Sequence, residues 1–250
     1  MSEPAPTPVI AFFDIDNTLV RGATIYLVGL GAWRLKLLRL RDVATFAWQQ
    51  ARFIAVGENM RHMNSAKDRT LELLRGHTED ELRTLGEEVY DRQIVSRLWP
   101  HVLERANAHL AQGDQVWLVS ATAEIMAQVI ASRLGFSGAL GTRFESENGV
   151  FTGRLDGPML HGAEKAAAVS RLAAGDTRSG TSTGRAESTD APRPAAVDLA
   201  DCWAYSDSSN DVPLLSAVGH PVAVNPDAGL EKLAAERGWP VLWASKKRQA

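Results

Sequence analysis

The chain has 250 residues, of which 45% are hydrophobic, and a formal net charge of −3 at pH 7. This length and apolar content suit one large domain or a core with a smaller module, and the charge does not indicate nucleic-acid binding. The single cysteine, Cys202, excludes an intramolecular disulfide. Because residues 1–8 do not resemble a signal peptide and no apolar run reaches the roughly 18 residues of a membrane span, we expect a soluble cytoplasmic protein.

The first predicted element is a short strand that ends in acidic residues. Val9 to Phe13 is an apolar run typical of a buried strand, and Asp14, Asp16 and Thr18 follow it at alternate positions. Two aspartates separated by one residue are also common in a simple turn. In an open α/β sheet, however, ligands bind at the carboxyl ends of strands, where paired carboxylates can serve a cation or a substrate.

The next segment, from about residue 21 to residue 99, is predicted to be an all-helical insert. Apolar residues recur at helical spacing from Ala23 to about Ala55, a second helix is expected near 65–74, and Thr78 with Glu81 has the spacing of a capping box. Residues 26–56 carry one acid and five basic side chains: Arg34, Lys36, Arg39, Arg41 and Arg52. Such a helix can contact a membrane surface or an anionic substrate; we favour a small helical domain with a solvated basic face.

The rest of the chain alternates helices with short apolar strands, which indicates an α/β fold. A hairpin is expected from Ala139 to Leu155 around the turn at 147–149. Residues 174–196 contain no aromatic residue and no Val, Ile or Leu, so this segment is predicted to be a flexible loop within the core. The other predicted elements are helices at 101–112, 123–134, 162–174, 212–217 and 228–237, and strands at 116–119, 201–205, 220–224 and 241–243.

Polar residues recur where these strands end and helices begin. Ser120 follows the strand at 116–119 and can either cap the next helix or donate to a phosphate. Lys165 lies in the first turn of its helix, where the helix dipole disfavours a cation, so either an anionic partner or a solvated lysine is expected. The segment from Ser206 to Asp211 places Asp207, Asn210 and Asp211 directly after another strand.

In a parallel sheet these strand ends lie at one edge and can form a single site. Asp14, Asp16, Asp207 and Asp211 would supply an oxygen-rich, negative environment of the kind that binds Mg²⁺, whereas the histidines and the lone cysteine do not suit zinc. An aspartate can attack phosphorus and form an aspartyl-phosphate. A second carboxyl group can protonate the leaving oxygen and later activate water.

Together these four segments resemble the haloacid dehalogenase-like (HAD) superfamily of phosphohydrolases, subfamily IB, which is phosphoserine-phosphatase-like. Its motifs match Asp14-x-Asp16-x-Thr18, Ser120, Lys165 and the Asp207–Asp211 segment in the same order. The resemblance implies a Rossmann-like core, mainly of parallel strands, formed by residues 1–20 and 100–250, with a helical cap at 21–99.

The resemblance also implies a role for each motif residue. Asp14 becomes the nucleophile and Asp16 the acid/base. The expected metal ligands are Asp14, Asp16, Asp207 and Asp211. Asp16 would bind through its backbone carbonyl, and Asp211 can instead support the lysine. The expected phosphate-binding and supporting residues are Ser120, Lys165, Thr18 and Asn210.

The substrate is expected to be a small phosphomonoester. In the phosphoserine phosphatases that the chain resembles, a glutamate a few residues after the first motif reads the substrate amine, but Ala23 stands at the matching position. This counts against phosphoserine and leaves histidinol phosphate, a lysophospholipid-type phosphate or another small metabolite open. A phosphotransferase on the same fold and a binding module without turnover are the alternatives to a hydrolase.

Overall fold

A six-stranded parallel sheet forms the centre of the molecule. The computed structural model describes residues 9–34, 70–176 and 196–243. The strand order is β3-β2-β1-β6-β7-β8, and every neighbouring pair is parallel. The order reverses at β1, whose neighbours β2 and β6 are far away in the sequence, so ligand binding is favoured beside the carboxyl end of β1. The strands are β1 (Ile10–Phe13), β2 (Gln115–Ala123), β3 (Gly138–Thr142), β6 (Trp203–Ser206), β7 (His220–Val224) and β8 (Val241–Leu242).

The sheet is buried on both faces, as parallel sheets are. Along β1 the fully buried side chains alternate: Ala11 and Phe13 belong to one hydrophobic cluster, and Ile10 and Phe12 to the other. The first cluster includes residues of α5 (Pro100–Gln112) and α6 (Glu124–Leu134). The second includes residues of α7 (Ala163–Ala173), α8 (Val212–Ala217) and α9 (Ala228–Arg237). The predicted α/β fold, with a mainly parallel sheet, is therefore confirmed.

Local sequence signals place most of these helices correctly. Gly113 and Gly135 end α5 and α6 in the left-handed conformation that glycine tolerates. The bounds of α8 and α9 match the predicted ranges, and Asp227 caps α9 through a bond from the Leu230 N–H. Among the described residues, no helix has both the length and the apolar character needed to cross a membrane.

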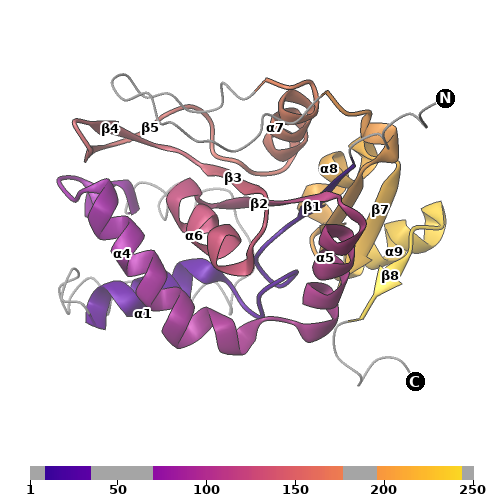
Figure 1. The fold of residues 1–250 in the computed structure, drawn as a ribbon, viewed down its shortest axis with the longest axis horizontal. Coiled ribbons are helices and arrows are strands. Elements are labelled where there is room, and N and C mark those ends of the chain that lie inside the picture. The colour runs from indigo at the N-terminus through magenta and orange to yellow at the C-terminus, as the bar shows by residue number, and fades with distance from the viewer. Residues whose placement is uncertain (1–8, 35–69, 177–195, 244–250) are drawn as a thin grey trace.

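The insert after β1 is helical in the part of it that the structure describes. It contains α1 (Thr24–Arg34), α4 (Glu79–Val89), a π-helical turn (Tyr90–Ile94) and a 3₁₀ turn (Val95–Arg97). The predicted capping box is present, with Thr78 and Glu81 bonded reciprocally. α4 lies beside α6, and α1 lies beside α4 (Figure 1); buried residues of α1 and α4 join the cluster on the α5–α6 face of the sheet. The predicted helix after Arg34, most of the one near 65–74 and most of the basic side chains lie outside the described residues.

The flanking hairpin differs from the prediction in its first strand. Gly138–Thr142 is β3, a parallel strand at the edge of the main sheet beside β2, and not an arm of the hairpin. The antiparallel pair is β4 (Phe144–Glu147) with β5 (Val150–Leu155). The prediction was wrong because the apolar run gives strand character but does not identify the partner strand. Residues 177–195, the centre of the segment predicted to be a flexible loop, lie outside the described residues.

Candidate active site

The candidate site lies at the carboxyl ends of β1 and β6, where the strand order reverses. The register pairs Phe13 with Tyr205, and the Asp14 N–H donates to the Tyr205 carbonyl at 2.9 Å, so the residues that follow the two strands start side by side. β1 also pairs with β2, with Phe13 opposite Leu118, which places Ser120 on the other side of the same edge. The predicted convergence of these strand ends is confirmed.

A buried lysine joins two of the predicted acids. Lys165 Nζ lies 2.6 Å from Asp14 Oδ1 and 2.7 Å from Asp211 Oδ2, and all three side chains are buried. Ser206 Oγ also donates to Asp211 Oδ2 at 2.7 Å. Of the two possibilities expected for Lys165, the anionic partner is therefore the one present. Ser206, which sequence reasoning missed, holds Asp211 in place; its only sequence signal is its position at the end of β6.

The charges of this cluster are unequal, because four carboxyl groups face one ammonium group. Burial, followed by the charges of Asp211, Asp16 and Asp207, raises the pKa of Asp14, and the Lys165 ammonium opposes this rise. The two carboxylates raise the pKa of Lys165 although burial lowers it. The lysine therefore stays charged at neutral pH, and the raised pKa values of the acids show that one ammonium group does not balance all four carboxylates.

The side-chain contact of Asp207 is longer than those of Asp14 and Asp211 with the lysine. Its Oδ1 accepts a hydrogen bond from Thr18 Oγ1 at 3.3 Å. Burial, followed by the negative charge of Asp211, raises the pKa of Asp207 to about 7. Thr18 is fully buried and its hydroxyl hydrogen is directed to this carboxylate, so in this structure it orients Asp207.

Asp16 is held by Thr24, the first residue of α1. Its Oδ1 accepts the Thr24 N–H at 2.7 Å and the Thr24 hydroxyl, and Thr24 Oγ1 lies 3.2 Å from Thr122 Oγ1. Burial raises the pKa of Asp16, and the two bonds from Thr24 oppose that rise. Thr24 and Thr122 were not among the predicted site residues, and hydroxyls at these positions carry no motif of their own.

Ser120 and Asn210 differ in their surroundings. Ser120 is buried, and its Oγ accepts the Thr122 N–H at 3.2 Å. It does not cap α6, whose N-cap residue is Ala123 without a side-chain bond, so the capping interpretation is wrong and the hydroxyl remains free to donate. Asn210 is exposed, and its backbone N–H donates to Ser208 Oγ at 3.2 Å.

The donor set suits a hard cation rather than a soft one. Among the described residues, no three Asp, Glu, His or Cys side chains gather as a complete metal-ligand set. Mg²⁺, however, needs only one or two carboxylates and completes its shell with carbonyl, water and phosphate oxygens. The acidic excess around Asp14 and Asp207 therefore fits a divalent cation.

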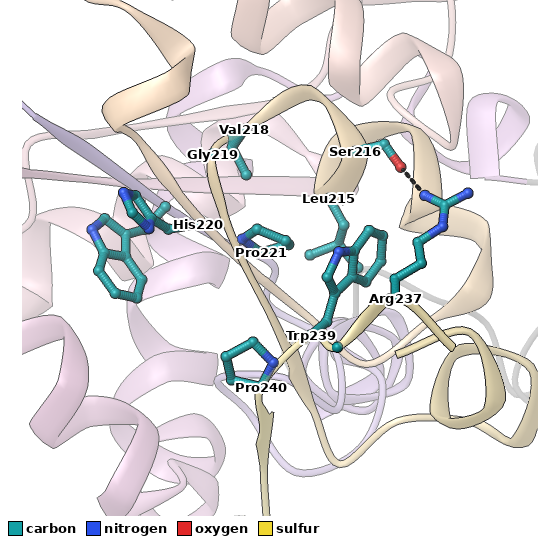
Figure 2. Close-up of a pocket in the computed structure, with 11 residues that line it drawn as sticks. Leu215, Ser216, Val218, Gly219, His220, Pro221, Arg237, Trp239 and Pro240 are labelled. Carbon is teal, nitrogen blue, oxygen red and sulfur yellow. Dashed lines mark hydrogen bonds between the residues drawn. The ribbon is translucent and has the colours of Figure 1, made fainter. Parts of the chain in front are cut away.

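A separate cavity lies at the opposite edge of the sheet. It has a volume of about 440 Å³ and is lined by Trp203, His220, Arg237 and Trp239 among others (Figure 2). Trp203 and His220 are the first residues of β6 and β7, so this cavity opens at the amino ends of the strands. It is distinct from the site that Asp14 and Asp207 define at the carboxyl ends.

Comparison with known proteins identifies the family of the chain. The sequence model of the family described as haloacid dehalogenase-like hydrolase matches residues 11–216, which include all four motifs. The chain belongs to this family. It is therefore an HAD-type phosphatase, a phosphoric monoester hydrolase resembling the phosphoserine phosphatases, and the family in general uses a divalent metal and a small phosphorylated substrate.

Relatives of this HAD phosphatase are named for different substrates. A Mycobacterium tuberculosis protein named phosphoserine phosphatase SerB1 is 44% identical over 95% of this chain and 71% of its own length. A Neisseria meningitidis protein named histidinol-phosphatase is 30% identical over 93% of this chain and 97% of its own length. A solved structure of unknown function from Bordetella pertussis has a TM-score of 0.77 and 29% identity, covering 96% of this chain and all of that one.

Proposed function

We propose that this HAD phosphatase is a Mg²⁺-dependent phosphomonoester hydrolase that works through an aspartyl-phosphate formed on Asp14. The observation that supports this most is the contact of Lys165 Nζ with Asp14 Oδ1 and Asp211 Oδ2 in a buried site at the end of β1. An ammonium group there lowers the repulsion between an anionic nucleophile and an anionic phosphate. A lysine serving only to stabilise the fold would not need to bridge the acid that follows the first strand.

The proposed reaction has two steps. A carboxylate oxygen of Asp14 forms a bond to phosphorus while the bond from phosphorus to the leaving oxygen breaks, and that oxygen takes a proton from Asp16. A water molecule then attacks the phosphorus and gives a proton back to Asp16. The acyl-phosphate P–O bond breaks, which releases inorganic phosphate and restores the Asp14 carboxylate.

The Mg²⁺ ligands are proposed to be Asp14, Asp207 and the backbone carbonyl of Asp16. When bound, the ion would offset negative charge on the phosphoryl group. Asp211 was expected to bind either the metal or the lysine. Its contacts with Lys165 and Ser206 favour support of the lysine.

The phosphoryl group is proposed to bind Lys165 and Ser120. Ser120 keeps a hydroxyl hydrogen available, because its oxygen accepts the Thr122 N–H. For Thr18 we favour orientation of Asp207 over direct phosphate contact. Asn210 is left as an exposed residue that a bound substrate could contact.

The division into a core at 1–20 and 100–250 and a cap at 21–99 is also a proposal. The two connections between these parts run together: Arg21 N–H donates to the Arg97 carbonyl and Trp99 N–H donates to the Leu19 carbonyl, both at 2.9–3.0 Å. Paired connections of this kind are a suitable place for the cap to close over the site and exclude water.

The substrate class is narrowed by Ala23, which is half-buried and directly precedes α1. An alanine side chain cannot pair with an ammonium group, so we propose a phosphomonoester other than phosphoserine, with histidinol phosphate as one candidate. The name of the M. tuberculosis relative keeps phosphoserine as the alternative. A lysophospholipid-type phosphate would use the basic segment, as would contact with a membrane surface, but most of that segment lies outside the described residues.

The test is phosphate release from a panel of phosphomonoesters with Mg²⁺, with and without a chelator. The panel includes phosphoserine, histidinol phosphate, glycerol phosphate and lysophosphatidate, and Asp14→Asn is run beside the wild type. We expect release that the chelator blocks and that falls by at least about 10³-fold in Asp14→Asn. Activity that survives in Asp14→Asn would refute the nucleophile assignment, and product formation that requires an added alcohol would indicate a phosphotransferase.

A further inference from the structure

Thr24, the first residue of α1, makes two contacts with the proposed acid/base. Its backbone N–H donates to Asp16 Oδ1 at 2.7 Å, and its hydroxyl donates to the same oxygen. Thr24 is fully buried, so its hydroxyl has no contact with solvent. Both donors act on a single carboxylate oxygen, which distinguishes the two oxygens of Asp16 from each other.

We propose that Thr24 is a positioning residue that holds Asp16 Oδ1 and thereby makes Asp16 Oδ2 the oxygen that exchanges a proton with the substrate. The proposal rests on the proposed function, in which Asp16 protonates the leaving oxygen. An oxygen that accepts two hydrogen bonds is a poor site for a proton, because a proton there would face two other hydrogens. The proton therefore resides on Oδ2. Because the carboxyl group is rigid, the bonds that hold Oδ1 also fix the position of Oδ2.

The same contacts favour the product of the first step. As the bond from phosphorus to the leaving oxygen breaks, its electron pair stays on that oxygen, which takes the proton from Asp16 Oδ2. Asp16 is then a carboxylate, and the two Thr24 donors stabilise this charged form. A leaving oxygen that cannot bear negative charge needs this proton transfer most.

A chain of hydroxyls extends the arrangement to β2. The single hydroxyl hydrogen of Thr24 is given to Asp16, so Thr122 Oγ1, 3.2 Å away, donates to Thr24 Oγ1. The Thr122 N–H donates in turn to Ser120 Oγ at 3.2 Å. Three segments, the loop after β1, the start of the insert and the end of β2, are thereby fixed to one another at the acid/base.

The experiment compares two phosphomonoesters whose leaving groups differ. Glycerol phosphate has an alkyl leaving group that needs protonation, whereas the phenolate of p-nitrophenyl phosphate leaves readily without it. We expect Thr24→Val, which keeps the shape and the N–H bond but removes the hydroxyl, to lower kcat/KM for glycerol phosphate by about 10- to 100-fold and for p-nitrophenyl phosphate by less than about 3-fold. Thr24→Ser should recover most of the loss for glycerol phosphate.

Two further variants keep the result decisive. In an Asp16→Asn background, Thr24→Val should bring no additional preference for the better leaving group, because the group that it positions is already absent. Thr122→Val, which keeps both Thr24 donors, should show the same preference to a smaller extent and serves if Thr24→Val does not fold. Equal losses for both substrates in Thr24→Val and Thr122→Val, or no loss in either, would overturn the proposal. Failure of the proposed function would look different, because the wild type would then show no Mg²⁺-dependent release from either ester.

Discussion

Removal of the Asp207 carboxylate should stabilise the metal-free protein, although the residue belongs to the proposed site. Burial and the charge of Asp211 raise the pKa of Asp207 to about 7, against 3.8 for an unperturbed aspartate. This difference corresponds to about 4 kcal/mol, which solvent screening of a half-buried side chain reduces to about 2 kcal/mol. Asp207→Asn keeps the shape and can still accept the Thr18 hydroxyl, so it should relieve this cost.

The effect should depend on pH in a defined direction. Between pH 3.8 and about 7, the folded protein holds a proton on Asp207 that the unfolded chain has released. The stability of the wild type should therefore fall as the pH rises through this range, and the full cost should be present above it. Asp207→Asn lacks this dependence, so the gain of about 2 kcal/mol is expected at pH 8 and should almost vanish near pH 4.

Urea unfolding in the presence of a chelator, at pH 4 and pH 8, measures this difference. Addition of Mg²⁺ at pH 8 should stabilise the wild type and should stabilise Asp207→Asn much less. Asp201→Asn, at an exposed acid, is the matched control and should change stability by less than about 0.5 kcal/mol. Equal stability of Asp207→Asn and wild type at pH 8, or the same difference at both pH values, would refute the reasoning.

Three further substitutions test the fold and the substrate class. Gly219→Ala would place a Cβ 1.7 Å from the Ala200 carbonyl oxygen and should lower the free energy of unfolding by about 3 kcal/mol, measured with urea. Tyr205→Phe removes the hydroxyl 2.9 Å from His109 Nε2 and should cost about 1–2 kcal/mol in the same assay. Ala23→Glu should raise kcat/KM for phosphoserine relative to glycerol phosphate by about tenfold or more.

Each of these has a control that separates the stated cause from a general disturbance. Gly29→Ala, in α1 with no atom within 4 Å of the added Cβ, should leave stability unchanged or raise it by up to about 1 kcal/mol. Tyr205→Phe should cost less in a His109→Leu background, because the bond is already absent. Ala23→Gln should not shift the preference toward phosphoserine; a shift equal to that of Ala23→Glu would argue against charge recognition.

Local signals in the sequence were sufficient for most of the framework. The glycines after α5 and α6 and the capping box at Thr78 act within one turn of the chain; the capping box was predicted and is present, and the glycines end the two helices where the predicted ranges end. β3 was assigned to the wrong partner because pairing depends on contacts between distant segments. The apolar run that forms it is compatible with either a hairpin arm or an edge strand.

The site was predictable where a residue was chemically out of place. Lys165 is unfavourable in the first turn of α7, and this misfit indicated the anionic partners that the structure contains. Thr24, Thr122 and Ser206 are ordinary in their local settings. Their importance depends on which carboxylate each one faces, and that is decided by the tertiary structure.

The structure gives the four aspartates of the candidate site different partners. Asp14 and Asp211 share the Lys165 ammonium, and Asp16 is held by two donors from Thr24. Asp207 accepts a neutral hydroxyl at 3.3 Å, whereas Asp14 and Asp211 each contact the ammonium group directly. A divalent cation is therefore expected to matter most at Asp207, and proton transfer is expected at Asp16, whose partners are neutral hydroxyl and amide groups. Asp16 accepts two short hydrogen bonds and Asp207 one longer bond, so a buried charge on Asp207 is the costlier of these two. This explains why Asp207→Asn is expected to stabilise the metal-free protein while weakening its response to Mg²⁺.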